Sequence, residues 1–364
     1  MADVSGTGGR FEVGLVVAGH PHTTQHLDTL RSLEVVEGIH LCTLGGDDLE
    51  PLTRAAGSKA RPAAPDLEAL LARPEVDTLL VAVRNDLSVD VLERAVRAGK
   101  GALFEKPGAT SAASLRAVAG AARARGLTLG AILPWRYHPI SREIRDLIQQ
   151  GALGRLLAVE ARMVTSQVRY RRPEHWLFKR QQAGSGILSW LAVHWIDLLG
   201  FLCGQRVAAV TALTANRNPE PIEVEDTACL ALRYQDGTLG TLHAGYLLPG
   251  SASGYAGAAY DNYLAIRGYD GWVSWPHTSP PSYTCFSTAP GWAAAGRQER
   301  RFDPPPLQAY GGMHGLHFVR DFLHAARAGR PAPCPIEDAV HALEVVEAAL
   351  EAAASGRTVT LEAT

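Results

Sequence analysis

Residues Asp77–Asn85 read DTLLVAVRN, and residues Ala98–Pro107 read AGKGALFEKP. Within the first stretch, Thr78–Val83 is a continuous run with the length and composition of a strand buried on both faces. Helical apolar spacing over Val89–Ala98 follows and ends at a glycine, and Gly101–Phe104 then has the composition of the next buried strand. A strand, a helix and a second strand in this order are typical of a parallel sheet covered by helices on both faces.

The same alternation extends along the chain in both directions. Further strands are expected at Phe11–Ala18, Val35–Leu44 and Thr128–Leu133, and further helices at Leu27–Leu33, Leu67–Ala72 and Ser114–Arg125. We therefore predict an α/β fold in which residues 1–134 form a Rossmann domain that binds a dinucleotide.

The pattern changes after Gly154. Strands with alternating apolar residues are expected in the segments LLAVEARM (156–163), VAAVTALTA (207–215), TACLALRY (227–234), GTLGTLHAGY (237–246), NYLAIRGY (262–269) and GWVSW (271–275). Consecutive strands with few helices between them predict a large, open, mainly antiparallel sheet in an α+β domain over residues 135–335, which also holds a helix at Ile187–Leu202. Residues 276–306 are rich in Pro, Gly and Ser and are expected to form a long loop. Residues 336–364 are expected to form a C-terminal helix and strand that pack back near the first domain.

The bulk composition limits the class of protein. The 364 residues have a formal net charge of −2 and 20% charged residues, which gives no electrostatic reason to expect nucleic acid or a membrane surface as a partner. Met1–Arg10 lacks the features of a secretory signal, and the sequence alone suggests no apolar stretch long enough to span a bilayer. The five cysteines are scattered without metal-ligand spacing. Together these features predict a cytoplasmic protein with reduced thiols.

The turn after the first strand carries a weak dinucleotide signal. Only the middle glycine of the G-x-G-x-x-G pattern is present, as Gly19. Its neighbours are candidate cofactor ligands by position, and they are Ala18, His20, Pro21 and His22. His20, His22 and His26 suggest a metal, but no carboxylate or cysteine stands beside them in the sequence, so no metal site is predicted. Asp47, after the second strand, is the candidate for the adenosine ribose and slightly favours NAD over NADP.

Lys106 is the leading catalytic candidate. It is one of only four lysines, and it follows a buried strand at the carboxyl edge of the sheet, where ligands bind in open α/β folds. Partial desolvation there would lower the pKa of a lysine enough for it to exchange a proton with a hydroxyl group. Pro107 restricts the backbone that follows.

His194 is the second catalytic candidate. It lies on the expected helix with Asp197 three residues later on the same face, so the carboxylate could orient the imidazole. A histidine buried in the core at a helix–sheet contact is the alternative interpretation.

Several blocks in the same order resemble the Gfo/Idh/MocA family, named for glucose-fructose oxidoreductase, inositol dehydrogenase and a rhizopine catabolism protein. They are Asp77–Asn85 and Ala98–Pro107, followed by Trp135-Arg-Tyr-His-Pro139, Gly151-Ala-Leu-Gly154, Ala183-Gly-Ser-Gly186, Val193-His-Trp-Ile-Asp197, Glu225-Asp226-Thr and Asp236-Gly-Thr. The resemblance implies a Rossmann domain followed by an open antiparallel sheet, with hydride transfer to or from sugars, cyclitols or related cyclic substrates. It also implies that Lys106 acts in catalysis and that Glu105 contacts the cofactor ribose or supports local structure.

The chain departs from the family pattern at two points. The family places an aspartate four residues before the histidine, and this chain has Trp190 there. An indole offers only one N–H donor and an apolar face, so His194 becomes the leading acid/base group with Lys106 as its partner. Residues 86–88 read DLS where the family expects a histidine after Asn85.

The remaining site candidates follow from position in these blocks. Besides those at the first turn, the cofactor candidates are Val83, Arg84, Asn85, Glu105, Lys106 and Arg136. The substrate candidates are Tyr137, Arg169, Trp176, Trp190 and His194. Further candidates for the pocket are Tyr255, Tyr260, Tyr263 and His314.

The predicted function is an NAD(P)-dependent oxidoreductase acting on CH–OH groups. Because Trp190 replaces the aspartate, three alternatives stay open. They are a net non-redox glycoside cleavage through a transient keto-sugar with recycled NAD, imine reduction, and an inactive dinucleotide-binding sensor. A homo-oligomer formed through the second-domain sheet is also expected.

Overall fold

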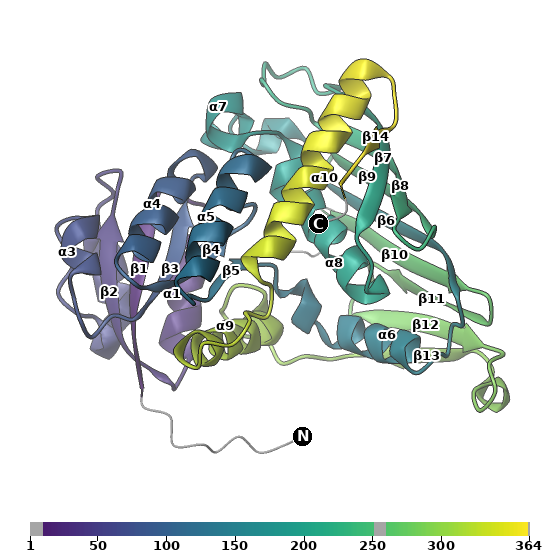
Figure 1. Cartoon of the computed structure of the whole chain (residues 1–364), viewed down its shortest axis with the longest axis horizontal. Coiled ribbons are helices and arrows are strands. Elements are labelled where there is room, and N and C mark those ends of the chain that lie inside the picture. Colours follow the sequence, from purple (N-terminus) through teal and green to yellow (C-terminus); the bar gives the residue numbers. More distant parts are fainter. Residues whose placement is uncertain (1–9, 251–259, 363–364) are drawn as a thin grey trace. The chain divides into compact units, whose positions relative to one another are not determined.

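The computed structural model describes residues 10–250 and 260–362, and the chain divides into two compact units (Figure 1). The first unit comprises Met1–Glu105, Ala117–Ile132 and Pro306–Ile336, and the second comprises Lys106–Arg116, Leu133–Pro305 and Glu337–Thr364. Residues 1–9, which include most of the N-terminal segment considered above, and Tyr255 lie outside the described residues.

The first unit contains a five-stranded parallel sheet with the order β2-β1-β3-β4-β5. Its strands are β1 (Phe11–Ala18), β2 (Val36–Thr43), β3 (Thr78–Val83), β4 (Gly101–Glu105) and β5 (Leu129–Ile132). All residues of β3, β4 and β5 are buried, as expected for strands that are covered on both faces. The predicted parallel Rossmann sheet is confirmed.

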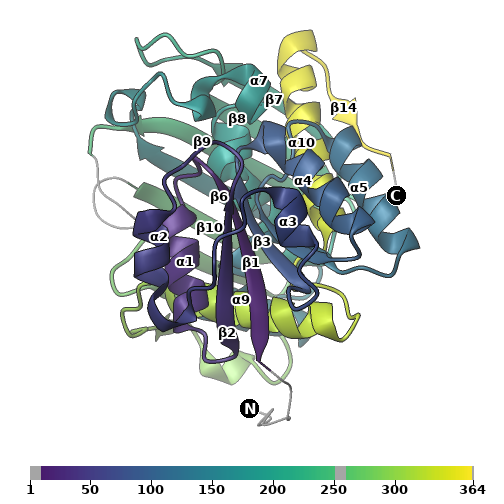
Figure 2. The same ribbon diagram turned by 90° about the vertical axis from the view of Figure 1, so that its left-hand side faces the viewer.

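Helices cover both faces of this sheet. Figure 2 shows α1 (Thr23–Ser32) and α2 (Glu50–Ala56) on one side of the strands, and α3 (Leu67–Leu71) and α4 (Asn85–Arg97) on the other. α3 begins where the Asp66 carboxylate accepts a hydrogen bond from the backbone of Ala69, a normal N-terminal cap. The sequence predicted the other helices near their observed positions but did not predict α2. α5 (Ala112–Ala124) runs across the boundary of the two units.

The chain returns to the first unit near its end. α9 (Gly312–Arg327) packs against α1, β4 and β5, and the backbone of Ala131 donates a hydrogen bond to Cys334 at 3.0 Å. A side chain at Gly130 would lie 2.8 Å from the Cys334 carbonyl oxygen, so glycine permits this approach. Residues 306–336 therefore belong to the first unit, whereas the sequence placed residues 306–335 in the second domain.

The second unit is built on a nine-stranded sheet with the order β13-β12-β11-β10-β6-β9-β8-β7-β14. The strands are β6 (Leu156–Ser166), β7 (Val207–Ala215), β8 (Thr227–Tyr234), β9 (Leu239–Leu248), β10 (Tyr260–Gly268), β11 (Gly271–Pro276), β12 (Ser282–Ser287), β13 (Gln298–Arg301) and β14 (Val359–Thr360). All neighbours are antiparallel except β6 and β9, which run parallel, so the predicted mainly antiparallel sheet is confirmed. The segment predicted as a loop at 276–306 contains β12 and β13.

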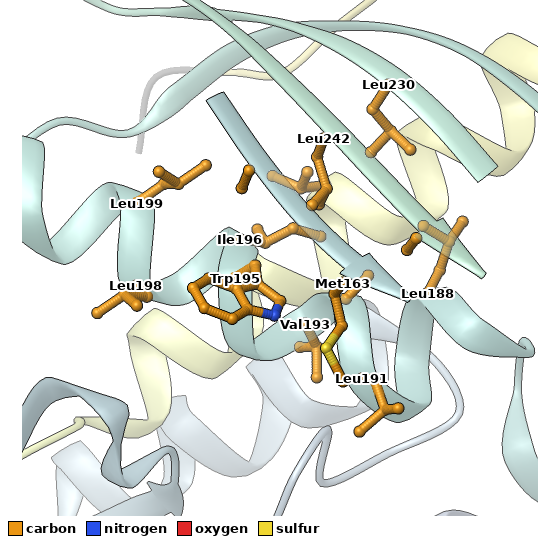
Figure 3. Packing of buried hydrophobic residues seen from close by; sticks show 14 of the residues in the cluster. Met163, Leu188, Leu191, Val193, Trp195, Ile196, Leu198, Leu199, Leu230 and Leu242 are labelled. Carbon is orange, nitrogen blue, oxygen red and sulfur yellow. The ribbon is translucent and has the colours of Figure 1, made fainter. Parts of the chain in front are cut away.

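Helices bury one face of this sheet. They are α6 (Pro139–Gln149), α7 (Arg180–Ala183), the π-helical turn η5 (Leu188–Ala192), α8 (Val193–Cys203) and α10 (Ile336–Ser355), with short 3-10 turns at Pro134–Tyr137, Val168–Tyr170 and Trp176–Phe178. Figure 3 shows side chains of the η5–α8 segment, such as Leu188 and Ile196, against Met163, Leu230 and Leu242 of the strands. Side chains of α10 belong to the same core, so the C-terminal helix packs on the second unit's own sheet.

The segment Arg180–Cys203 corrects one expectation. It has 24 residues and contains an 18-residue window with a mean hydropathy of 1.6, values that match those of a membrane-spanning helix, which the sequence was not expected to contain. However, 83% of its most apolar window is buried inside the protein. Burial of this kind is typical of a helix at the centre of a folded core.

Candidate active site

Lys106 is fully buried in the second unit. Its ammonium group lies 3.6 Å from the centroid of the Trp190 ring and donates a hydrogen bond to the backbone carbonyl of Trp190. A cation over an indole face is stabilised by the negative face of the ring, most strongly when water is excluded. The sequence predicted Lys106 and Trp190 as site residues separately, and the fold brings them together.

Trp190 and His194 come from one continuous helical segment. Trp190 lies in the π-helical turn η5, and His194 lies in the first turn of α8 that follows. Single π-helical turns are rare and occur frequently at functional sites. Both side chains are buried, and Trp176 packs edge-to-face on Trp190 with ring centroids 6.4 Å apart. Trp176 and Trp190, two of the substrate candidates, therefore lie in one region with Lys106, and His194 follows Trp190 on the same helical segment.

Glu225 holds the start of this helical segment. One of its carboxylate oxygens accepts hydrogen bonds from the backbone of Gly186 at 2.8 Å and of Leu188 at 3.1 Å. A carboxylate at a helix N-terminus satisfies amides that have no partner within the helix. A side chain at Gly186 would lie 1.9 Å from the Glu225 carbonyl oxygen, so only glycine permits this contact. Burial raises the pKa of Glu225 above its ordinary value, although these amide hydrogen bonds oppose the rise.

Arg136 and Asp197 form a buried ion pair in the second unit. The guanidinium binds both carboxylate oxygens of Asp197, and it also lies 2.9 Å from Asp338 at the start of α10. This two-point geometry is the strongest form of an arginine–carboxylate pair. The contacts support a structural role for Arg136, which ties α8 to α10, in addition to its predicted cofactor role.

In the first unit, the edge where β1 and β3 end matches the shape of a dinucleotide site. Gly19 has a φ of +60°, pairs with Val83 across the two strand ends, and has open space where a side chain would project. Such a glycine lets a phosphate group approach the backbone closely beside the start of α1. Asn85 begins α4 and is buried, while Arg84 pairs with Asp86 through two contacts of 3.0 Å. The described residues of this edge therefore fit a bound dinucleotide.

Asp47 lies just beyond the end of β2. Its carboxylate accepts a hydrogen bond from the Thr43 hydroxyl at 2.8 Å, and its own backbone donates to the same hydroxyl. The loop is thus held in a defined conformation. Gly45 occupies the position where the ribose ligand is expected, and Asp47 stays the displaced candidate for that role.

Glu105, the last residue of β4, is surrounded by histidines of the first unit. His22 Nδ1 lies 2.8 Å and His26 Nε2 lies 2.6 Å from the same Glu105 oxygen, and His20 lies 3.9 Å away. Burial alone would raise the pKa of Glu105, but the charges of His22 and His20 and the histidine hydrogen bonds hold that pKa well below its usual value. Proximity of this carboxylate to the three histidines was not visible in the sequence.

The other candidates have the following surroundings. Tyr137 packs under the Arg142 guanidinium at 4.0 Å, and Arg169 is exposed and lies over the Tyr170 ring at 4.9 Å. Tyr263 lies near Arg162, and Tyr260 packs against the core of the second unit. His314 belongs to α9 in the first unit, where burial lowers its pKa to about 4.

Comparison with known sequences identifies the family. Residues 13–132 match the sequence model described as "Oxidoreductase family, NAD-binding Rossmann fold", and residues 141–274 match the "GFO/IDH/MocA C-terminal domain". The chain belongs to the Gfo/Idh/MocA family. Its first unit is thus an NAD-binding Rossmann domain, which confirms the expected class of cofactor.

Curated members of the Gfo/Idh/MocA family with similar sequences include enzymes named for sugars. A 1,5-anhydro-D-fructose reductase of Ensifer adhaerens is 30% identical over 189 residues, which cover 52% of this chain and 56% of that protein. A levoglucosan dehydrogenase of Pseudarthrobacter phenanthrenivorans is 24% identical over 202 residues, or 49% and 52% of the two chains. The chain thus matches about half the length of these curated relatives.

Solved structures share the fold over nearly the whole chain. A levoglucosan dehydrogenase in complex with NADH and levoglucosan aligns with a TM-score of 0.83 at 20% identity and covers 96% of this chain and 99% of that chain. An oxidoreductase domain protein from Kribbella flavida aligns with a TM-score of 0.82 at 22% identity, covering 98% and 100%. At these identities the likeness shows the shared fold.

Sequence reasoning recognised the Glu225-Asp226 block of the Gfo/Idh/MocA family but assigned it no role. In the structure Glu225 anchors the helical segment of Trp190 and His194, and Asp226 accepts hydrogen bonds from the backbones of Arg217 and Asn218. These residues therefore position the site from the second unit's own scaffold. Spacing could not have revealed the role of Glu225, because Gly186 is 39 residues earlier in the chain, whereas Arg217 and Asn218 are only nine and eight residues before Asp226.

Proposed function

We propose that this protein is an NAD(P)-dependent oxidoreductase that transfers hydride to or from a CH–OH carbon of a sugar, cyclitol or related small cyclic substrate. The observation that carries the proposal is the buried Lys106 ammonium group against Trp190, four residues before His194 on the same helical segment. Names of similar proteins support a cyclic sugar derivative as the substrate class, since they include an anhydrofructose reductase and a levoglucosan dehydrogenase.

In the oxidative direction a substrate hydroxyl loses a proton while its carbon loses a hydride. The nicotinamide ring, when bound, accepts the hydride. His194 is the proposed acceptor of the hydroxyl proton, because a neutral imidazole can take up a proton near neutral pH. The Lys106 ammonium stabilises the negative charge that develops on the oxygen, and its contacts with Trp190 fix its position.

NAD is the proposed cofactor in preference to NADP. Asp47 provides a carboxylate at the end of the second strand, and its hydrogen bond with Thr43 keeps it there. A carboxylate can bind the two hydroxyl groups of an unmodified ribose and repels the additional phosphate of NADP.

Trp190 itself supports a second candidate. With an indole in place of the family's aspartate, the site is also suited to glycoside cleavage through a transient keto-sugar, in which the nicotinamide is oxidised and reduced within one turnover. Imine reduction and an inactive dinucleotide-binding sensor are the remaining alternatives.

The decisive experiment follows nicotinamide absorbance and product formation together. The purified protein is incubated with NAD or NADH and with 1,5-anhydro-D-fructose, levoglucosan, inositols, simple glycosides and cyclic imines. Hydride transfer predicts stoichiometric change in absorbance with a sugar or cyclitol, whereas internal recycling predicts product without lasting change. Turnover of cyclic imines alone would support the imine alternative.

Two variants identify the catalytic groups in the same assay. Lys106→Met and His194→Gln are each expected to lower kcat/KM by at least about a hundredfold, the usual contribution of positioned acid/base groups. Unchanged turnover in both variants would overturn the proposed mechanism. Dinucleotide binding without any turnover would leave the sensor as the better description.

We also propose that the protein is a cytoplasmic homo-oligomer. The side of the second unit's sheet away from its helices exposes large apolar side chains, including Leu213 at 76% and Leu239 at 57% exposure. A second copy of the chain would cover such a surface. Light scattering coupled to size exclusion is expected to give at least twice the mass of one chain, and a monomer at working concentration would contradict this. The part of the chain that the structure describes contains no disulfide bond, which supports the proposed reducing compartment.

A further inference from the structure

Three imidazoles and one carboxylate converge within the first unit. The three histidines all come from the β1–α1 turn and the first turns of α1, and the carboxylate is that of Glu105 at the end of β4. Ligand-type atoms of His20, His22 and Glu105 all lie within 4.8 Å of one another. His26 Nε2 lies 2.6 Å from the same Glu105 oxygen, although His26 does not belong to that set of mutually close atoms.

Local and long-range structure each contribute to this convergence. His22 and His26 are four residues apart, so they lie on one face of α1, a spacing that is used to hold zinc in helical sites. Parallel β1 and β4 both flank β3 and end at the same edge of the sheet. This topology brings Glu105 beside histidines that are about 80 residues earlier in the chain.

The histidine–glutamate cluster is buried, and some of its nitrogen and oxygen atoms make no hydrogen bond within the described part of the chain. His20, His26 and Glu105 are each at most 4% exposed, and the Tyr310 ring covers His22 and His26 with centroid distances of 4.7 Å to each. Among the residues that the structure describes, Glu105 Oε2 and His26 Nδ1 are buried without a hydrogen-bond partner. The three histidines face the other carboxylate oxygen, Oε1, so a cation bound by both oxygens of Glu105 would give the buried Oε2 a partner and remove the cost of leaving it unsatisfied.

The separations are compatible with a shared ion. Ligands bound tetrahedrally to zinc at about 2.0–2.2 Å lie roughly 3.4 Å from one another. The distances from the Glu105 oxygen to the three histidines are 2.6, 2.8 and 3.9 Å, so shifts below 1 Å would bring them to that value.

We propose that His20, His22, His26 and Glu105 form a binding site for one divalent transition-metal ion of the zinc class. Imidazole nitrogens combined with a single carboxylate favour zinc and its neighbours over magnesium or calcium, which prefer oxygen ligands. No carboxylate stands beside the histidines in the sequence, so no metal site was predicted there, and the fold supplies the missing carboxylate as Glu105. His20, His22 and Glu105 are also predicted cofactor residues, so the metal site would adjoin the proposed dinucleotide site, and its test is therefore made on protein that is free of dinucleotide.

A second histidine–glutamate pair in the same unit provides a matched control. His40 Nε2 lies 2.7 Å from Glu12, but Arg61 and Arg73 surround that pair. With one imidazole and two cationic guanidinium groups, the pair is already neutralised and repels a metal ion.

The test uses the full-length protein without a histidine tag, stripped with a chelator and free of dinucleotide. Zinc is titrated by calorimetry, and cobalt is titrated by visible absorption, whose bands report the coordination of the ion. We expect one ion per chain with micromolar or tighter affinity, and cobalt bands of four- or five-coordination.

Variants decide whether the ion occupies this cluster. Glu105→Gln and His22→Ala are each expected to weaken binding by more than about tenfold, because losing even an outer partner of a metal site costs roughly 10–100-fold. His40→Gln is expected to leave binding unchanged. Circular dichroism is used to check that each variant is folded. If one of the two cluster variants does not fold, His26→Gln is measured in its place. The absence of saturable binding to the folded wild type, or binding that these cluster variants leave unchanged, would overturn the proposal.

Discussion

The Lys106 ammonium group is 3.6 Å from the centroid of the Trp190 ring, where the resemblance to the Gfo/Idh/MocA family led us to expect an aspartate. An aspartate would compensate the ammonium with a full negative charge, whereas the indole supplies only the partial charge of its face. The backbone carbonyl of Trp190 accepts a hydrogen bond from the same ammonium. Lys106 thus contacts Trp190 in two ways, through the ring face and through the backbone carbonyl.

Replacing Trp190 tests the importance of this contact. Trp190→Phe keeps an aromatic face and is expected to retain folding with a loss of less than about tenfold in kcat/KM. Trp190→Ala removes the face and leaves a cavity, so it is expected to lower the free energy of unfolding by about 3–5 kcal/mol. Chemical denaturation and steady-state kinetics measure the two effects. Equal activity in Trp190→Ala and wild type would show that the ring does not position Lys106.

Glu225→Gln tests the buried carboxylate that anchors the helical segment of Trp190 and His194. Since the folded-state pKa of Glu225 is raised, the wild-type protein is most stable below the unfolded-state pKa of about 4.5 and loses stability as the pH rises through the folded-state value. Glutamine can still accept the hydrogen bonds of Gly186 and Leu188 and does not ionise. The variant is therefore expected to gain stability relative to wild type between pH 4 and pH 8, by on the order of 1 kcal/mol. Thermal melts across this range measure the gain, and a difference that does not vary with pH would contradict the expected ionisation of Glu225.

Arg136→Met is expected to be strongly destabilising. It leaves the Asp197 carboxylate buried without the guanidinium that binds both of its oxygens, a change that costs about 3–5 kcal/mol in buried pairs. Arg136→Lys keeps the charge but loses the two-point geometry, so it should cost less. Arg97→Met, which removes an exposed pair with Glu93, is the control and should change stability by no more than about 1 kcal/mol. Similar losses in Arg136→Met and Arg97→Met would refute the structural role of Arg136.

Asp47→Asn tests cofactor preference. Removing this charge is expected to increase the ratio of NADP to NAD in kcat/KM by on the order of fivefold, which corresponds to a charge repulsion of about 1 kcal/mol. The neighbouring Asp48, which caps the backbone of Glu50, supplies the control variant Asp48→Asn with no expected change. If both variants leave the preference of wild type unaltered, Asp47 does not face the adenosine ribose.

Prediction from sequence was most accurate for elements whose apolar spacing is regular. Strands β3, β7 and β8 were predicted with their observed bounds. β3 is apolar throughout because both of its faces are buried, and β7 and β8 alternate because one face of each is exposed. β12 and β13 were not predicted, because their segment is rich in Pro, Gly and Ser. These two strands are the last two at one end of the sheet, where β13 pairs with β12 alone. The parallel pairing of β6 with β9 was also invisible, because local patterns carry no information on which strands become neighbours.

The sequence by itself determined the order and type of the main elements and the family of the chain, and it made Lys106 and His194 the candidate catalytic residues, which stays a prediction. These depend on short-range spacing and on motifs that remain readable without coordinates. Only the tertiary structure decided that Lys106 meets Trp190 and that Glu105 meets His22 and His26, because these partners are 84, 83 and 79 residues apart. Such contacts exist only after the strands have paired in their final order, since pairing sets which side chains share one edge of a sheet.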